Sequence, residues 1–175
     1  MLTVPHTLIG AALGSLAPDS PVSNVLAFGL GWLSHFVLDT IPHWERLIEA
    51  PEGRVKGFAT EQTPNMWPRL YFWQAVIDVL LAATIILGLI YFWENELSFW
   101  RSTWFWGALG GFFPDAVDNN PYITPHLQHR RGWRWLRHFH QSIHISSHAQ
   151  KNMPRFVGLV TQVVAVGFSL IWILR

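Results

Sequence analysis

The chain has 175 residues; half of them are hydrophobic, only 13% are charged, and 11 Trp and 12 Phe are present. A formal charge of +1 gives no reason to expect a nucleic-acid partner, and the lack of Cys excludes disulfides and thiolate metal sites. This length fits a single domain over residues 1–175, and the composition is too apolar for a typical soluble domain. We therefore expect an all-α integral membrane protein.

Five apolar segments follow one another along the chain, and a helix needs about 20 residues to cross the hydrocarbon of a bilayer. Three of the segments approach or exceed that length, whereas the first and the fourth are short and can only half-span. Polar stretches rich in Gly, Pro or His separate them, and we expect loops at residues 43–69 and 119–155. The expected membrane segments are residues 5–17, 22–42, 70–93, 99–113 and 156–174.

The basic residues are distributed unevenly when the five segments alternate in direction. Ten of the twelve Lys and Arg then fall on the side of the two loops, and only Arg101 and Arg175 remain on the other. Because cytoplasmic loops carry the excess of basic residues, this side is predicted to be cytoplasmic, with the N-terminus. The ten residues are Arg46, Arg54, Lys56, Arg69, Arg130, Arg131, Arg134, Arg137, Lys151 and Arg155.

Residues 133–148 are predicted to form an amphipathic helix on the cytoplasmic surface of the membrane. One face carries an apolar stripe, and the neighbouring Arg residues can meet anionic headgroups. His140, His144 and His148 are spaced by four and share a face, which is the spacing of helical zinc sites, although surface His residues are often only interfacial. The stripe consists of Trp135, Leu136, Phe139 and Ile143.

His35 and Asp39 stand four residues apart near the end of the second segment. On a helix they lie on the same face, one turn apart. One nitrogen and one carboxylate oxygen aimed at one point suit a divalent metal, and ionisable pairs inside a membrane segment usually carry a function. The alternative is a hydrogen bond that only joins two helices.

Further ionisable residues fall on the same predicted side of the membrane. His6 begins the first segment, Asp78 lies about two turns into the third, and Asp115 and Asp118 follow the fourth. Asp78 can instead be a protonated carboxyl bonded to a neighbouring helix, and Asp115 or Asp118 can cap a turn. Their common sidedness favours a metal or catalytic site.

The sequence resembles a family of bacterial inner-membrane proteins described as metal-dependent hydrolases. The resemblance rests on His6 before a Gly-rich apolar segment, on Ser34, His35 and Asp39 at a helix end, and on two Pro-Asp turns, at residues 18–19 and 114–115. It implies a multi-pass protein of the bacterial inner membrane that hydrolyses its substrate with a bound metal.

We therefore expect five membrane segments, a cytoplasmic amphipathic helix and a polar pocket that opens to the cytoplasm. A divalent metal, with zinc favoured, would assist hydrolysis of an anionic substrate, which is either a small molecule or a membrane lipid such as a phospholipid or a lipid-linked phosphate. A small transporter or channel for metal ions or protons is the first alternative, and a non-enzymatic membrane assembly protein is the second. The expected metal ligands are His6, His35, Asp39, Asp78 and Asp115, and the expected catalytic residues are His140, His144 and Asp118.

Overall fold

The computed structural model describes residues 3–18, 20–41, 43, 69–93, 99–118, 124–127, 129–143 and 155–175. All regular structure within these ranges is helical, which confirms the expected all-α class. The helices are α1 (Thr3–Gly14), α2 (Pro21–Asp39), α3 (Arg69–Trp93), the 3-10 turn η1 (Phe99–Arg101), α4 (Thr103–Asp118), α5 (Thr124–Leu127), α6 (Arg131–Ile143) and α8 (Arg155–Ile173).

Local chemistry explains where α2 begins. Ser20 is the N-cap, and its Oγ accepts a hydrogen bond from the backbone N–H of Ser23 at 3.1 Å. Pro21 occupies the first turn, where a missing N–H costs nothing and the fixed φ favours the helix. The expected break at residues 18–21 therefore acts as a helix start signal.

The fourth helix differs from the expectation that it would stop at Pro114. Instead α4 continues through Pro114 to Asp118. Proline lacks the N–H for the helical bond to residue 110 and crowds that carbonyl, but it need not end a helix that neighbours support. The continuation carries Asp115 on a helix, where a turn was expected.

Helices α1, α2 and α4 pack backbone to backbone through glycines. A Cβ atom placed on Gly107 of α4 would collide with the carbonyl of Gly10 on α1, and one on Gly31 of α2 would collide with the carbonyl of Gly107. Only glycine permits this approach, which is a common way for membrane helices to pack. The contact fixes the spacing of these three helices.

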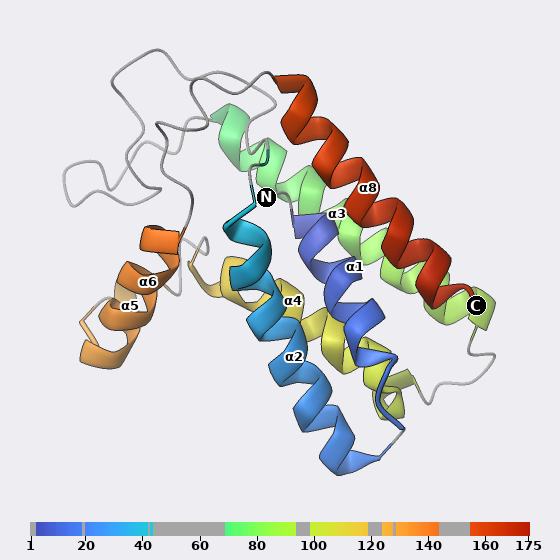
Figure 1. Ribbon diagram of the computed structural model, residues 1–175. Helices are drawn as coiled ribbons and strands as arrows, with labels where there is room; N and C mark the ends of the chain where they lie inside the picture. Colours follow the sequence, from blue (N-terminus) through green and yellow to red (C-terminus); the bar gives the residue numbers. More distant parts are fainter. Residues whose placement is uncertain are drawn as a thin grey trace.

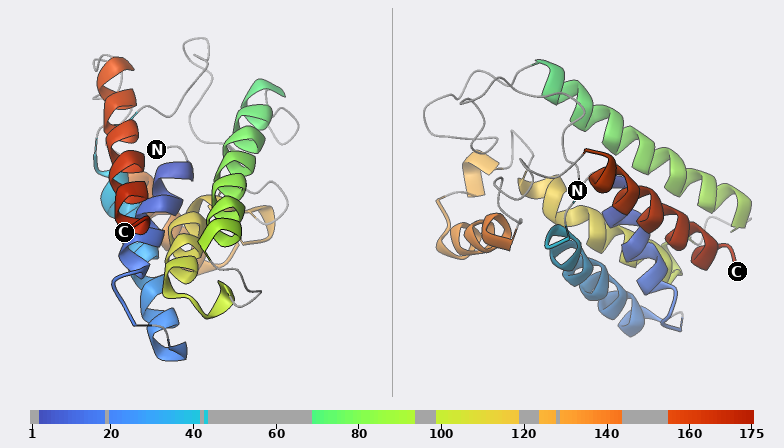
Figure 2. Two further views of the ribbon diagram at one scale, coloured as in Figure 1. Left: turned by 90° about the vertical axis from the view of Figure 1, so that its right-hand side faces the viewer. Right: turned by 45° about the horizontal axis from the view of Figure 1, so that its top comes forward.

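Helix α1 lies at the centre of the bundle, between α2 and α4 on one side and α3 and α8 on the other (Figure 1). An apolar core built on Leu8, Ala11 and Ala108 fills the space, with Ala82 of α3 and Ile173 of α8 at its edge. Helices α1, α2, α3, α4 and α8 run in alternating directions along the chain, as Figures 1 and 2 show.

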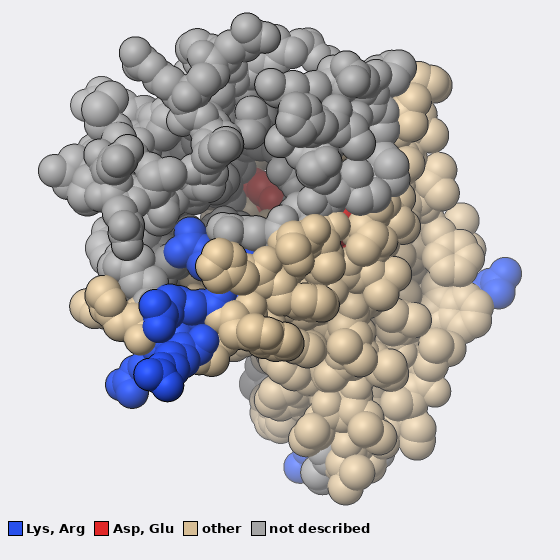
Figure 3. All heavy atoms as spheres, turned by 60° about the vertical axis from the view of Figure 1, so that its left-hand side comes forward, with Lys and Arg blue, Asp and Glu red and all other residues tan. Residues whose placement is uncertain are grey.

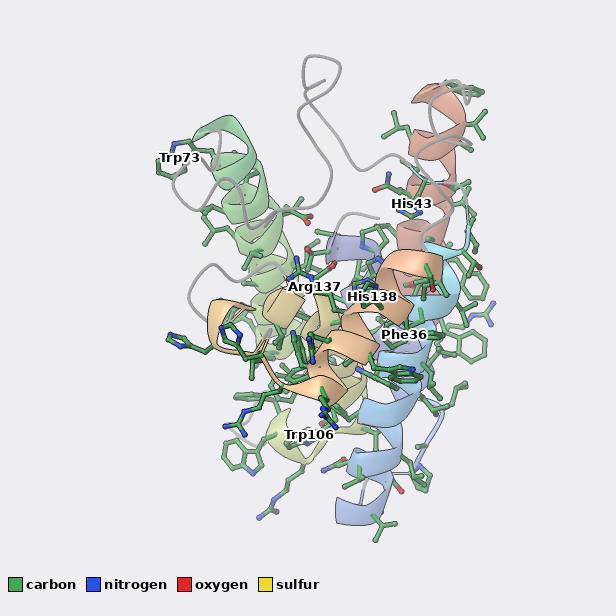
Figure 4. The ribbon with its side chains drawn as sticks, turned by 90° about the vertical axis from the view of Figure 1, so that its left-hand side faces the viewer. Phe36, His43, Trp73, Trp106, Arg137 and His138 are labelled. Atoms are coloured by element: carbon green, nitrogen blue, oxygen red, sulfur yellow. The ribbon has the colours of Figure 1, made fainter. Side chains whose placement is uncertain are left out.

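Helix α6 stands to one side of the bundle with α5 (Figures 1 and 2). It meets α2 through aromatic side chains: the ring of Phe36 lies 5.5 Å from that of Phe139 and 5.4 Å from that of His140. Figure 4 shows Phe36 on the part of α2 that faces α6. A small aromatic contact between Phe36 of α2 and two residues of α6 thus joins α6 to the bundle.

Two helices within the described ranges are long and apolar enough to cross a membrane, Val22–Asp39 of α2 and Phe156–Ile173 of α8. A shorter apolar stretch, Val76–Tyr91, lies in α3. Most of the two expected loops lies outside the described residues, apart from His43, α5 and α6.

Candidate metal centre

Four elements bring ionisable side chains to one end of the bundle. His6 comes from the first turns of α1, His35 and Asp39 from the last turns of α2, and Asp115 from the last turn of α4. Because α1 runs opposite to α2 and α4, the beginning of α1 meets the ends of the other two. His140, near the end of α6, joins them from the side.

Asp39 is the centre of the cluster, and three imidazoles face its two carboxylate oxygens. The distances are 3.1 Å from His6 Nε2 to Oδ1, 3.2 Å from His35 Nε2 to Oδ2, and 3.0 Å from His140 Nε2 to Oδ2. His6, His35 and Asp39 are fully buried. A buried carboxylate surrounded by nitrogens has the composition of a metal site or of a hydrogen-bonded network.

The orientation of His35 favours a cation. Its Nδ1 lies 2.9 Å from the carbonyl oxygen of Gly111, which only accepts hydrogen bonds, so Nδ1 carries the proton. In the neutral ring, Nε2 then presents a lone pair towards Asp39 Oδ2 at 3.2 Å and towards His140 Nε2 at 3.2 Å. A nitrogen lone pair that faces a carboxylate is repelled by its negative charge. A cation between the nitrogen and the carboxylate removes this repulsion. A carbonyl that fixes the tautomer of a ligating His is a common feature of metal sites.

His6 gives a second indication. Its ring is wholly buried, and neither nitrogen has a hydrogen-bond partner among the residues that the structure describes. Its Nε2 still lies 3.1 Å from Asp39 Oδ1, within ion-pair distance. The ring stacks on that of His35 with centroids 3.9 Å apart. Buried polar nitrogens without partners are rare, and a metal ligand role accounts for one of them.

The spacing of the donor atoms fits a metal. Ligands about 2.0–2.1 Å from zinc in a tetrahedron lie about 3.3 Å from one another. The nitrogen–oxygen distances of 3.0–3.2 Å around Asp39 are close to this value. Within the described part of the chain, two groups have ligand atoms that all lie within 4.8 Å of one another: His6 with His35 and Asp39, and His35 with Asp115 and His140.

Asp115 occupies the more open side of the cluster. Its Oδ1 lies 3.8 Å from His35 Nε2, and its side chain is 16% exposed, against 1% for Asp39. A carboxylate that reaches both the cluster and solvent can exchange protons with water, which a sealed one cannot.

Asp78, which we expected among the ligands, has a partner at the start of α1. It lies outside both groups, and its Oδ2 accepts a hydrogen bond of 2.6 Å from the backbone N–H of Thr3. The first N–H groups of a helix lack partners within that helix, and its positive end favours a carboxylate. Asp78 thus anchors the start of α1, much as in the alternative that it bonds to a neighbouring helix. The same contact positions His6, which lies one turn further along α1.

The remaining expected site residues are only partly described. Asp118 is the last residue of α4, and its side chain lies outside the described residues, as does all of His144. His140 was expected as an acid–base group, whereas its Nε2 lies among the ligand atoms. The four-residue spacing of His140 and His144 indicated this helix, but spacing alone could not show that His140 meets Asp39, from which it is 101 residues away.

Helix α6 and the residue before it carry four arginines. Arg130, Arg131 and Arg134 are exposed and Arg137 is partly so, and Figure 3 shows Lys and Arg side chains gathered in one blue cluster. Trp135 is 69% exposed and stacks on Phe139 with centroids 5.8 Å apart. Arginines beside exposed aromatic rings suit a surface with anionic headgroups.

Comparison with protein-family models gives no match, and the searches of curated proteins and of solved structures give none either. The function of the chain must therefore be inferred from its own geometry.

Proposed function

We propose that this protein is a membrane-embedded, metal-dependent hydrolase that acts from the cytoplasmic face on an anionic phospholipid or lipid-linked phosphate. The observation that carries the proposal is the buried convergence of His6, His35, Asp39 and His140 at the end of the bundle, with Asp115 on its open side. Three imidazoles and a carboxylate are donors that zinc accepts, so zinc is the favoured metal.

The exposed surface supports a position within a membrane. Large aliphatic side chains of α2 are open to the surroundings, among them Val22, Val25 and Leu26, and α8 shows the same pattern with Val163 and Val164. Surfaces of this kind are rare on soluble monomers and normal where a helix faces lipid. With α1 and α4 as short segments beside α2, α3 and α8, the proposed number of membrane segments is five.

The orientation is proposed from the same alternation and the distribution of basic residues. The starts of α1, α3 and α8 lie at the same end of the bundle as the end of α2 (Figure 1). The metal cluster is at this end. Ten of the twelve Lys and Arg residues lie in the two segments, 43–69 and 119–155, that connect helices at this end. The excess of basic residues favours the cytoplasm for this end and the bacterial inner membrane as location.

Each residue has a proposed role in hydrolysis. A divalent cation held by His6, His35, Asp39 and His140 would polarise a phosphoryl oxygen and make water more acidic. Asp115 takes a proton from the attacking water and returns it to the lipid oxygen as the phosphorus–oxygen bond breaks. Gly111 holds the tautomer of His35, and the arginines of α6 attract the anionic headgroup.

A buried cluster open at one end favours an enzyme over a transporter. In the described part of the chain, the buried ionisable residues are His6, His35, Asp39, His43 and His140, all at this end. Past them the buried polar side chains, among them Thr103, Gln162 and Ser169, carry no charge, and glycines close the space between the helices. A pathway for ions or protons built on ionisable groups would have to continue through the full depth of the membrane.

Metal analysis of the purified protein in detergent tests the proposal directly. We expect about one zinc per chain in the wild type, none in His35→Ala, and the wild-type amount in His126→Ala, which changes an exposed His of α5. In parallel, release of phosphate from dioleoyl phosphatidic acid in nanodiscs should require zinc and be lost in His35→Ala. Equal zinc in wild type and His35→Ala would refute the metal site. Zinc binding without phosphate release would refute this substrate class.

A further inference from the structure

Helix α6 exposes aromatic rings and positive charge side by side. Trp135 and Phe139 are both exposed, and their rings stack with centroids 5.8 Å apart and planes 7° apart. Arg131 and Arg134 are exposed as well. Arg131 stands four residues before Trp135, so its charge borders the aromatic pair on the helix surface. Exposed rings beside cations are the groups by which interfacial helices contact anionic headgroups.

The aromatic rings of α6 continue onto α2. The ring of Phe139 lies 5.5 Å from that of Phe36, and Phe36 lies 4.8 Å from Trp32, one turn earlier on α2. This part of α2 belongs to a stretch that is long and apolar enough to cross a membrane. Aromatic side chains concentrate at the level of the lipid headgroups. In the proposed membrane position, the row of rings therefore places α6 at the headgroup level where α2 ends.

The contact of α6 with Phe36 also positions a metal ligand candidate. The ring of His140 lies 5.4 Å from that of Phe36, and its Nε2 lies 3.0 Å from Asp39 Oδ2. The other two imidazoles of the cluster, His6 and His35, belong to α1 and α2, whose backbones pack closely on α4 through glycines. His140 is therefore the donor whose position depends on where α6 lies.

We infer that α6 binds anionic lipid headgroups of the surrounding membrane, and that this contact completes the metal centre by holding His140 against Asp39. The inference rests on the proposed function and adds a regulation of its metal site. Charge complementarity selects the occupant, because four arginines lie on α6 or directly before it and residues 119–155 contain no Asp or Glu. Since the two sites are joined through one ligand, anionic lipid and zinc each raise the affinity for the other by the same factor.

The test measures the zinc affinity of the full-length protein in nanodiscs by competition with a chromophoric chelator. One set of nanodiscs contains phosphatidylcholine, and the other contains equal parts of phosphatidylcholine and phosphatidylglycerol. Phosphatidylglycerol supplies negative charge as a phosphodiester, without the phosphate monoester of phosphatidic acid. We expect about tenfold tighter zinc binding in the anionic nanodiscs, within the range of about 5–150-fold that is usual for coupled sites. Amide hydrogen exchange in α6 should be slower in the same nanodiscs.

Three variants locate the effect. Arg131→Gln together with Arg134→Gln should remove most of the lipid effect on zinc affinity, because each Arg near an anionic surface contributes to binding. Arg101→Gln together with Arg175→Gln is the matched control, because it removes the same charge at exposed positions outside α6 and should keep the effect. His140→Ala should bind zinc more weakly and equally in both lipids, whereas exchange in its α6 should still slow in the anionic nanodiscs.

Equal zinc affinity of the wild type in both lipids would overturn the inference and leave the hydrolase proposal intact. A lipid effect that persists in His140→Ala, or that both pairs of Arg variants lose equally, would overturn it as well. Slower exchange in α6 on dimerisation or on addition of transfer RNA, with none from lipid, would assign the surface to a second copy or to nucleic acid.

The outcome is separable from the hydrolase proposal, because neither zinc affinity nor hydrogen exchange requires turnover. A lipid-dependent zinc affinity in a protein that releases no phosphate would support the inference and refute the hydrolysis. Absence of zinc binding in both kinds of nanodisc would refute both proposals.

Discussion

Gly111→Ala tests whether backbone packing holds the metal cluster together. A Cβ at this position would collide with the carbonyl oxygen of His6 and lie 2.9 Å from its carbonyl carbon. Carbon atoms in contact are normally about 3.5–4.0 Å apart, so α1 and α4 must separate by about 0.6–1 Å at His6. The same residue accepts the hydrogen bond from His35 Nδ1, so two ligand candidates are displaced by one methyl group.

The expected loss can be stated for metal binding and for stability. Changing a group that orients metal ligands costs about 10–100-fold in metal affinity, and we expect a loss in this range. Overpacking costs about 1–3 kcal/mol, and replacing Gly by Ala in a helix returns up to about 1 kcal/mol. A net loss of about 1 kcal/mol lowers the Tm by about 2–4 °C in a chain of this size.

Zinc affinity is measured by competition with a chromophoric chelator in detergent, and the Tm by circular dichroism. Gly88→Ala is the matched control, because a Cβ at Gly88 of α3 has no atom within 4 Å. The control should keep wild-type zinc affinity and gain up to about 1 kcal/mol in stability. If Gly111→Ala binds zinc like the control, the packing of α1 on α4 does not position the ligands, and the reasoning fails.

The other predictions concern single residues and the membrane orientation. His140→Ala should weaken zinc binding while His138→Ala, at an exposed position of the same helix, should not; equal zinc affinity in both would limit His140 to an acid–base role. Asp78→Ala should lower stability by about 1 kcal/mol, as loss of a helix cap does, with zinc content retained. Loss of zinc in this variant would return Asp78 to the ligand set. A reporter fused after Arg175 should be active only outside the cytoplasm, and cytoplasmic activity would reverse the orientation.

The amino-acid sequence was sufficient for the helical class and for the convergence of His6, His35 and Asp39. Apolar runs placed the long helices within a few residues of their observed ends, as for α8, which was expected at 156–174 and found at Arg155–Ile173. The four-residue spacing of His35 and Asp39 was enough to put both on one face, because helix geometry is local. The alternating direction of the segments was enough to bring His6 to the same end.

Only the tertiary structure separated ligand candidates from anchoring residues. Asp78 and Asp115 are both carboxylates near the same end of the bundle, but one meets the start of α1 and the other meets His35. His140 joins Asp39 across 101 residues, through an aromatic contact that no periodicity encodes. Local spacing determines which face of a helix a side chain occupies, whereas its partner depends on how closely the helices approach. In this protein that approach is set by the backbone contacts of Gly31, Gly107 and Gly111.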